Sequence, residues 1–159
     1  LPGVTGMRGP LSCLNEARFG ISFGACGAAR ACYESALAYS LERRQFDQPI
    51  AGFQLTQKKL VDMMVATQRG TLVALHLGRM KDAGTLATPQ VSFAKMDNVA
   101  MALDVARTAR SILGANGITT EYPVIRHMNN LESVFTYEGT NEIHTLILGN
   151  AITGIPAFE

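Results

Sequence analysis

Three long stretches of this chain repeat apolar residues every three or four positions, and this periodicity restricts the fold more than any other feature. They cover residues 15–44, 53–82 and 88–114. Because an α-helix rises 1.5 Å per residue, each would be about 40–45 Å long. Helices of this length that are joined by short loops must pack antiparallel. With two shorter helices at 123–134 and 140–152, the predicted fold is all-α, an up-down helical bundle of three long and two short helices.

The periodic residues also predict which face of each long helix turns inward. In the second helix this face holds Leu60, Met64, Thr67, Thr71 and Leu75, and in the third Val91, Asn98, Ala102, Val105, Ala109 and Ile112. In the first helix it holds Phe19, Phe23, Cys26, Arg30, Tyr33, Leu37 and Leu41.

A second stripe on the first helix consists of small residues, Gly20, Gly24, Gly27 and Ala31. A glycine inside a helix costs roughly 1 kcal/mol relative to alanine, so three of them need a reason. Either a neighbouring helix or a ligand approaches this backbone closely.

Glycine and proline mark the expected boundaries. Gly84 is expected to stop the second helix, Thr88 and Pro89 to be the N-cap and first residue of the third, and Gly114 to end it. The opening segment LPGVTGMRGP resembles a connection between folded units. Residues 1–12 are therefore expected to link this domain to missing upstream domains, and residues 13–159 to form the helical bundle.

Composition excludes several classes of protein. Apolar residues make up 47% and charged residues 17%, which is typical of a globular domain. A net charge of +1 without a basic cluster argues against nucleic-acid or anionic membrane partners. No apolar run approaches the roughly 18 residues that span a bilayer, so no membrane insertion is expected. Three cysteines without metal spacing indicate a reducing compartment: the cytoplasm of a bacterium or the mitochondrial matrix of a eukaryote.

Helical bundles with carboxylates can hold two iron ions, but such sites need a Glu-x-x-His pair, and no glutamate here has a histidine three residues later. No metal site is therefore predicted. His76, His127 and His144 are expected on helix surfaces or in the core. The chain also has no Gly-x-Ser-x-Gly elbow and no phosphate-binding loop.

Four segments at predicted helix ends remain distinctive: LNEARFGI at 14–21, LERRQF at 41–46, LGANGITTEYPV at 113–124 and TYEGTNEIH at 136–144. In this order and spacing they resemble the C-terminal helical domain of the acyl-CoA dehydrogenase family, over essentially the whole chain. Within the family, NLESVFTYEGT and ILGNAITGIPAF are most similar to the members that act on glutaryl-CoA.

The resemblance implies an FAD-dependent enzyme that oxidises an acyl-CoA thioester between its α and β carbons. The base in the family is the glutamate of Tyr-Glu-Gly-Thr, which is Glu138 here. Some relatives place the base before the arginine that matches Arg18, but that position is Ala17. Without the resemblance, Glu138 would be an ordinary acid near a helix N-terminus. Gly139 beside it removes a side chain and would let a thioester approach the backbone.

The resemblance also implies the residues that contact FAD. Arg43, Gln45, Phe46 and Gln54 would contact the dinucleotide, as would Ser111, Ile112, Leu113, Gly114 and Ala115, whereas Thr140, Asn141 and Glu142 would line it after the base. The segments around Arg43 and Gly114 are expected to serve the FAD of a neighbouring subunit. Ala115 departs from the Gly-Gly that is usual in the family. Alternatively, Arg43 and Arg44 only complement a helix C-terminus.

The substrate contacts implied in the same way are Leu14, Asn15, Arg18, Tyr137, Gly139 and Phe158. Arg18 has a second interpretation, as a buried structural arginine.

The expected function is oxidative decarboxylation of glutaryl-CoA to crotonyl-CoA and CO₂, by a homotetramer built as a dimer of dimers that passes electrons to an electron-transfer flavoprotein. One alternative is a short-chain acyl-CoA dehydrogenase that does not decarboxylate. The other is a helical module without catalytic activity that holds subunits together.

Overall fold

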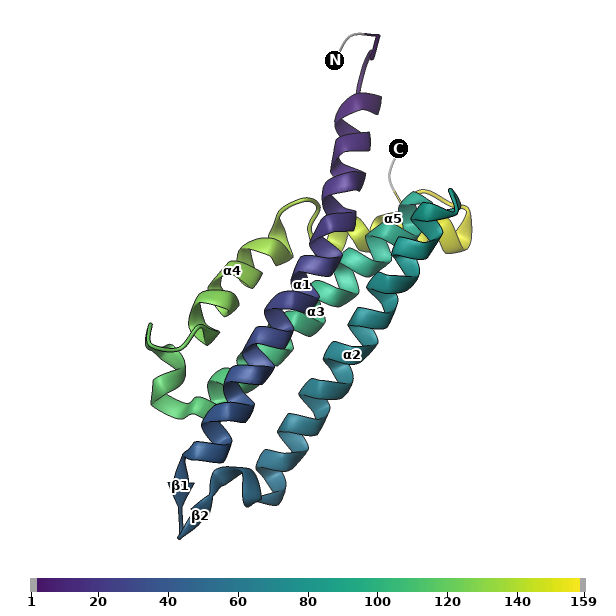
Figure 1. Cartoon of the computed structure of the whole chain (residues 1–159). Coiled ribbons are helices and arrows are strands. Elements are labelled where there is room, and N and C mark those ends of the chain that lie inside the picture. The colour runs from purple at the N-terminus through teal and green to yellow at the C-terminus, as the bar shows by residue number, and fades with distance from the viewer. Residues whose placement is uncertain (1–2, 158–159) are drawn as a thin grey trace.

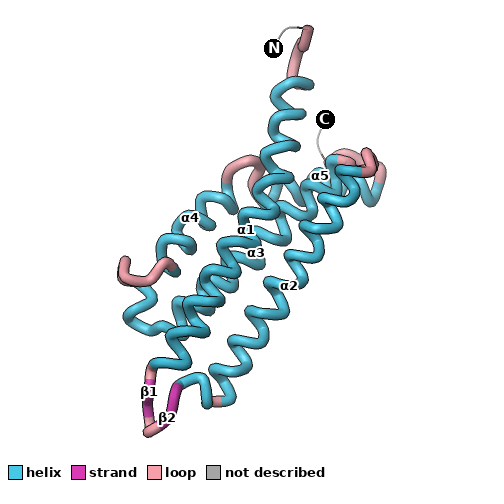
Figure 2. Tube along the Cα trace, viewed as in Figure 1, coloured by secondary structure: helices cyan, strands magenta, loops and turns pink. Residues whose placement is uncertain are grey.

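The computed structural model describes residues 3–157, and in that range the chain forms five α-helices. Three are long and two are short, and strands occur only in a hairpin between the first two helices (Figure 2), so the predicted all-α fold is confirmed. The elements are α1 (Arg8–Glu42), β1 (Arg44–Gln45), β2 (Gln48–Pro49), the 3-10 helix η1 (Ile50–Gly52), α2 (Gln54–Asp82), α3 (Thr88–Leu113), the 3-10 helix η2 (Gly114–Ile118), α4 (Val124–Thr136) and α5 (Asn141–Thr153).

Helix α3 is the centre of the bundle, because α1, α2, α4 and α5 all pack against it. Helices α1 and α3 run in the same direction, and α2 and α4 return (Figure 1). The bundle therefore has two distinct ends. The loop end holds the α4–α5 connection, residues 137–140, and the hairpin end holds β1, β2, η1 and η2 (Figure 1).

Helix α1 begins at Arg8, so the predicted start at Asn15 is wrong. Pro10 falls in the first turn, where a missing N–H costs nothing because the first four N–H groups of a helix have no helical partner. Residues 8–12 are thus helical, and the role of residues 1–12 as a link to other domains stays a prediction.

The buried face of α1 differs from the predicted one. The core contains Ala25, Ala29, Cys32 and Ala36, whereas Phe23 is 40% exposed and Leu41 is 59% exposed. Of the predicted stripe only Cys26 is fully buried. Small buried residues let α1 lie close to its neighbours, and the aromatic residues flank the contact rather than fill it. The same correction applies to α2, where Met63, Gly70, Ala74 and Leu77 are buried and the predicted Met64, Thr71 and Leu75 are exposed.

The inner face of α3 was predicted correctly apart from Ile112, which is only partly buried. Its polar member, Asn98, connects three helices. The Asn98 Nδ2 donates hydrogen bonds to the carbonyl oxygens of Ser22 on α1, at 3.1 Å, and of Gly70 on α2, at 3.2 Å. A Cβ added at Gly70 would lie 2.8 Å from Asn98 Oδ1 and 2.6 Å from Met101 Cε, so only glycine fits there.

The helix boundaries agree with the predictions to within a few residues, apart from the start of α1. Gly84 has a φ of 68° just after α2, as expected of a glycine that ends a helix. The N-cap of α3 is Ala87 and not the predicted Thr88; the Ala87 N–H donates to Gln90 Oε1 at 2.9 Å. No helix within residues 3–157 is both long and apolar enough to cross a membrane.

Candidate functional site

Glu138 lies in the connection between α4 and α5, at the loop end of the bundle. Its φ is 57°, and that of Gly139 is 94°. The left-handed conformation costs a residue with a side chain roughly 1–2 kcal/mol, so the surrounding structure must hold Glu138 in place.

Two buried cations hold this loop. The Arg18 Nε, from α1, donates a hydrogen bond to the Glu138 carbonyl oxygen at 2.7 Å. The Lys95 Nζ, from α3, donates to the next carbonyl, that of Gly139, at 2.8 Å. Arg18 is 6% exposed and Lys95 is 0% exposed. Consecutive carbonyls of one loop are therefore tied to two different helices.

His144, in the first turn of α5, packs against Gly139 of this loop and is fully buried. Within residues 3–157 neither of its ring nitrogens has a hydrogen-bond partner. A Cβ added at Gly139 would lie 3.1 Å from His144 Nε2 and 3.0 Å from Arg18 Nη2. The positive φ and this close packing together favour glycine at 139, and the approach of a thioester to its backbone stays a prediction.

Burial sets the charges of this cluster. It is the main cause that lowers the pKa of Lys95 to about 8; the nearby Arg18 lowers the pKa further, and the Glu138 carboxylate partly raises it. Burial also lowers the pKa of His144 to about 4, with Lys95 and Arg18 as further causes. At neutral pH Lys95 is therefore mostly charged and His144 is neutral.

The cations contact the backbone of the loop and leave the Glu138 side chain free. Glu138 Oε2 is buried, and no group among residues 3–157 forms a hydrogen bond with it. Glu142, four residues later, differs: it is exposed, and a hydrogen bond with Thr140 is the main cause that lowers its pKa. Thr140 is also the N-cap of α5. A buried carboxylate oxygen without a partner can accept a proton, which makes Glu138 the better candidate base.

Tyr137 lines a hollow of about 280 Å³ between α1 and α4. Ile21, Gly24, Leu131 and Val134 give it a mainly apolar wall. Within the described chain, nothing lies within 4 Å of a Cβ added at Gly20, Gly24 or Gly27. No helix of the described chain therefore approaches these glycines closely, and the approach of a helix from elsewhere or of a ligand stays a prediction.

The predicted substrate residues do not all lie together. Leu14 shares a helix face with Arg18, one turn earlier. The Asn15 Nδ2 instead donates to Thr88 Oγ1 at 2.9 Å and lines a separate hollow of about 200 Å³ between α1 and the start of α3. The contacts of Arg18 fit its second interpretation, as a buried structural arginine, while contact with a thioester stays a prediction. Phe158 lies outside the described residues.

The predicted FAD residues fall into two groups at opposite ends of the bundle (Figure 1). Thr140, Asn141 and Glu142 lie at the loop end, beside Glu138. The hairpin end carries Arg43, Gln45, Phe46, Gln54, Ser111, Ile112, Leu113, Gly114 and Ala115. These two groups cannot contact one FAD molecule from a single chain, because Lys95 and Leu113 alone are separated by roughly 27 Å along α3.

At the hairpin end the turn between the strands projects Phe46, which is 86% exposed. Phe46 and Asp47 have φ values of 50° and 62°. In the described chain, the one aromatic ring that packs against Phe46 is that of Phe53, with the two ring centroids 6.2 Å apart. Nearby, Asn116 Nδ2 donates to the Tyr39 hydroxyl at 3.1 Å and joins η2 to α1.

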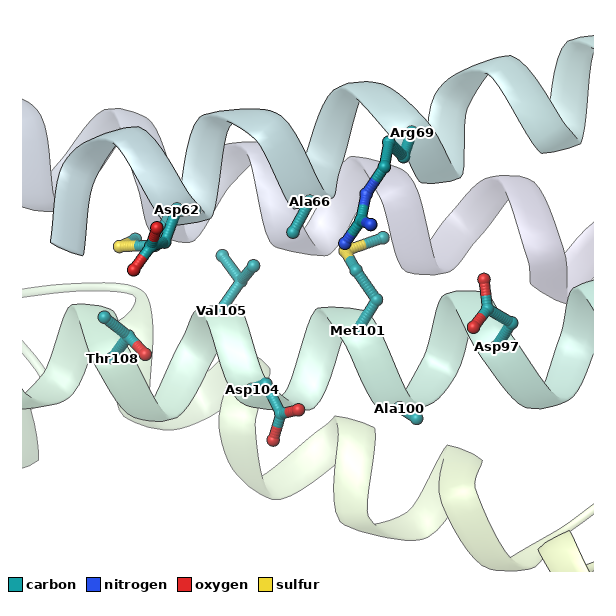
Figure 3. A pocket seen from close by; sticks show the side chains of 10 residues that line it. Asp62, Ala66, Arg69, Asp97, Ala100, Met101, Asp104, Val105 and Thr108 are labelled. Atoms are coloured by element: carbon teal, nitrogen blue, oxygen red, sulfur yellow. The ribbon is translucent and has the colours of Figure 1, made fainter. Parts of the chain in front are cut away.

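A further hollow, of about 330 Å³, lies between α2 and α3 (Figure 3). Met101 and Val105 project toward α2, and Asp62, Asp97 and Asp104 are spread along its length (Figure 3). It contains no predicted site residue. Within residues 3–157, no group of three or more His, Cys, Asp or Glu side chains is placed to hold a metal ion.

Sequence reasoning missed Lys95 and assigned His144 no more than a surface or core role. A signal for Lys95 was present, because Val91, Lys95, Asn98 and Ala102 follow one helical register. The prediction named the other three as inward-facing and omitted the lysine. No local signal shows that the Lys95 ammonium group bonds to a carbonyl 44 residues away.

Comparison with known proteins identifies the family. The model of the acyl-CoA dehydrogenase C-terminal domain matches residues 5–153. The chain belongs to the acyl-CoA dehydrogenase family.

Among members of the family, the chain is 35% identical to a glutaryl-CoA dehydrogenase of Desulfococcus multivorans over 136 residues, which are 85% of this chain and 35% of the relative. It is 33% identical to a short-chain specific acyl-CoA dehydrogenase of Megasphaera elsdenii over 139 residues, 87% of this chain and 36% of the relative. It thus spans little more than a third of the length of these acyl-CoA dehydrogenases.

Solved structures agree. A glutaryl-CoA dehydrogenase of Mycobacterium smegmatis superposes with a TM-score of 0.97 at 65% identity, covering 100% of this chain and 41% of that one. A second glutaryl-CoA dehydrogenase of M. smegmatis, in complex with FADH2, also gives 0.97, at 53% identity over 99% of this chain and 41% of that one.

Proposed function

We propose that the complete protein is an FAD-dependent acyl-CoA dehydrogenase that converts glutaryl-CoA to crotonyl-CoA and CO₂. The observation that carries the proposal is the Glu138 carboxylate, which has a buried oxygen free of partners on a loop held by Arg18 and Lys95. The 65% identity to a glutaryl-CoA dehydrogenase supports this choice of substrate.

In this proposal Glu138 removes the proton on the α carbon of the thioester. The conformation of the loop matters, because a general base must lie within hydrogen-bond reach of the proton that it takes. FAD, when bound, accepts the hydride from the β carbon. The apolar hollow beside Tyr137 lies next to the base in sequence and offers a wall for an acyl chain.

Decarboxylation then breaks the bond between the γ carbon and the distal carboxylate, and its electron pair moves into the enoyl thioester. The resulting dienolate takes a proton at the γ carbon, and Glu138, protonated in the first step, is the acid in place to supply it. A cation must hold the distal carboxylate. Arg18 Nε and Lys95 Nζ already donate to loop carbonyls, so we assign that cation to the part of the protein outside this chain.

The two ends of the bundle fit two different FAD molecules. At the loop end, Thr140, Asn141 and Glu142 would line the cofactor that serves Glu138. At the hairpin end, the exposed Arg43 would face a pyrophosphate and the exposed Phe46 would cover part of a neighbour's FAD. Open space beside Gly114 fits an approach to its backbone. Such sharing requires an oligomer, and we propose a homotetramer arranged as a dimer of dimers.

An electron-transfer flavoprotein would reoxidise the reduced enzyme. The compartment would be the cytoplasm in a bacterium or the mitochondrial matrix in a eukaryote.

The experiment compares two substrates on the complete, flavin-loaded protein. We expect glutaryl-CoA to bleach the flavin band and to release labelled CO₂, and butyryl-CoA to bleach it more slowly because it leaves the carboxylate-binding cation unpaired. Equal or faster reaction with butyryl-CoA and no CO₂ from glutaryl-CoA would assign a non-decarboxylating short-chain enzyme. A complete protein without flavin absorbance would instead indicate a helical module without catalytic activity.

A further inference from the structure

Lys95 is the residue of this chain that its fold explains least. Its side chain is fully buried in the bundle. Transfer of an ammonium group out of water costs several kcal/mol unless charges and hydrogen bonds compensate. Within residues 3–157 its recorded hydrogen bond is to one acceptor, the Gly139 carbonyl oxygen. An apolar side chain would fill the same space without this cost, so the position calls for an explanation other than core packing.

Lys95 and Arg18 bind the loop in the same way, each by donating a hydrogen bond to a backbone carbonyl oxygen. The two cations come from different helices, α3 and α1, and bind the carbonyls of two consecutive residues, Gly139 and Glu138. The His144 ring also packs against Gly139, on the side where a Cβ would lie 3.0 Å from Arg18 Nη2 and 3.1 Å from His144 Nε2. Three helices thus fix a loop whose central residue has the strained φ of 57°.

We infer that Lys95 is a positioning residue, which acts with Arg18 to hold the Glu138 backbone so that the carboxylate faces the substrate. That the positioned carboxylate is a catalytic base rests on the proposed function of Glu138.

The choice of acceptor matters. A salt bridge to the carboxylate would fix Glu138 equally well, but it would occupy the oxygens that must take a proton and would weaken the base. The two cations bind the carbonyls instead, and Glu138 Oε2 keeps no partner in the described chain. The loop is therefore immobilised while the base stays available. Three titratable groups interact electrostatically with Lys95. Arg18 lowers and Glu138 raises the pKa of Lys95, and Lys95 lowers the pKa of His144.

The test uses the complete, flavin-loaded protein with Lys95→Met, which retains the length of the side chain and removes the donor. Lys58→Met is the matched control, since Lys58 is exposed and, among residues 3–157, forms an ion pair only with Asp62 on the same helix. Three quantities are measured: the rate at which an acyl-CoA bleaches the flavin, the concentration of acyl-CoA that gives half the maximal rate, and amide hydrogen exchange.

For Lys95→Met we expect flavin content to be retained and the maximal bleaching rate to fall by tenfold or more. The half-saturating concentration should change by less than threefold, because the substrate does not contact Lys95. Amide exchange should accelerate in peptides that contain residues 136–141, the loop that Lys95 binds. It should stay unchanged in the peptides of α3 that do not contain Lys95. Lys58→Met should match the wild type in all three measurements.

Other outcomes separate this inference from the proposed function. Bleaching at the wild-type rate, or exchange that accelerates evenly along α3, would overturn the positioning role and leave Glu138 as the base. A wild-type protein that no acyl-CoA bleaches would refute the proposed function, while the exchange measurement would still decide whether Lys95 holds the loop. If Lys95→Met loses its flavin, two other variants are measured instead: Lys95→Gln, which retains an N–H donor, and Lys95→Ala, which has none. A wild-type rate and exchange pattern in Lys95→Ala would then refute the inference.

Discussion

At the loop end of the bundle, charged and polar side chains from α1, α3 and α5 are buried around residues 138 and 139, whereas at the hairpin end the predicted functional residues mostly face outward. Lys95 and Phe46 illustrate the difference: the lysine is fully buried and the phenylalanine is 86% exposed, the reverse of what their chemistry favours. The loop end is assembled within one chain. The hairpin end presents an exposed surface, which in the proposed function contacts the FAD of a neighbouring subunit.

The largest expected effect is that of Glu138→Gln, which retains the shape of the side chain and removes its basicity. In the complete protein, flavin should still bind, and its reduction by an acyl-CoA should slow by about 10²–10⁴-fold, as is typical when a general base is lost. Stopped-flow absorbance measures the rate. Glu132→Gln is the control, because Glu132 lies on α4 and its one ion pair within the described part of the chain is with exposed Arg107. Reduction at near wild-type speed would remove Glu138 from the mechanism.

A second prediction concerns the pH dependence of stability at the loop end. The pKa of His144 falls from its usual 6.5 to about 4 on folding, so between these values the unfolded chain binds more protons than the folded one. Stability should therefore fall as pH falls from 6.5 to 4, with a contribution of roughly 3 kcal/mol from His144.

Denaturant titrations of the complete protein at several pH values measure this dependence. His144→Phe should flatten the decline over that range, whatever its packing costs, because a packing cost does not vary with pH. An unchanged slope in the variant would show that other groups cause the acid sensitivity.

Two glycines compare the ends directly. Gly139→Ala should destabilise the complete protein by about 3 kcal/mol, because the new methyl group meets Arg18 and His144 and the residue has a φ of 94°. Gly114→Ala, at the hairpin end, should cost less, about 1–2 kcal/mol, since its backbone conformation (φ 61°, ψ −130°) opposes a side chain but nothing lies within 4 Å in the described chain. Calorimetry measures both. Equal losses would mean that neighbouring atoms contribute little at the loop end.

The smallest effect is expected for Arg43→Ala at the hairpin end. Arg43 is exposed, so unfolding should change by less than about 0.5 kcal/mol. If Arg43 contacts the pyrophosphate of a neighbour's FAD, flavin affinity should fall by roughly tenfold, the value of one charge-assisted hydrogen bond. Flavin release on dilution measures this, with Arg30→Ala as a control that loses an exposed arginine from α1, the helix that Arg43 directly follows. Unaltered affinity would favour the alternative in which Arg43 only complements the helix end.

The sequence predicted the number and order of the helices, and their bounds apart from the start of α1, because glycine, proline and apolar periodicity act locally. It predicted the inner face of α3 but named mostly exposed or partly buried residues on α1 and α2, where only Cys26, Leu60 and Thr67 are buried as predicted. There the core residues are Ala29, Cys32 and Ala36, or Gly70 and Ala74, whose apolar signal is weaker than that of the exposed Phe23 or Leu41. Only the close contact of neighbouring helices, a property of the whole bundle, makes the small residues the buried ones.

The site shows the same limit. Glu138 was identified through its motif, Tyr-Glu-Gly-Thr. The same short segment predicted the break between two helices in which Glu138 lies. The hydrogen bonds that hold the backbone of its loop were not predicted, because Arg18 lies 120 residues away from the carbonyl that it binds. Whether a lysine in a helical pattern faces water or a buried carbonyl depends on an element that only the folded bundle brings near.

The Asn98 amide, which bonds to α1 and α2 from the middle of α3, has a consequence for alternative packings. Long helices with alanine-rich faces can slide past one another by one turn, about 5.4 Å, at little loss of apolar contact. Such a slip of α1 would break the bond to the Ser22 carbonyl oxygen and leave the Asn98 amide only its bond to α2, at a cost of about 1 kcal/mol. It would also carry Arg18 away from the Glu138 carbonyl and Tyr39 away from Asn116 in η2. The amide and these two bonds together select a single register, so the loop end and the hairpin end are assembled correctly together or not at all.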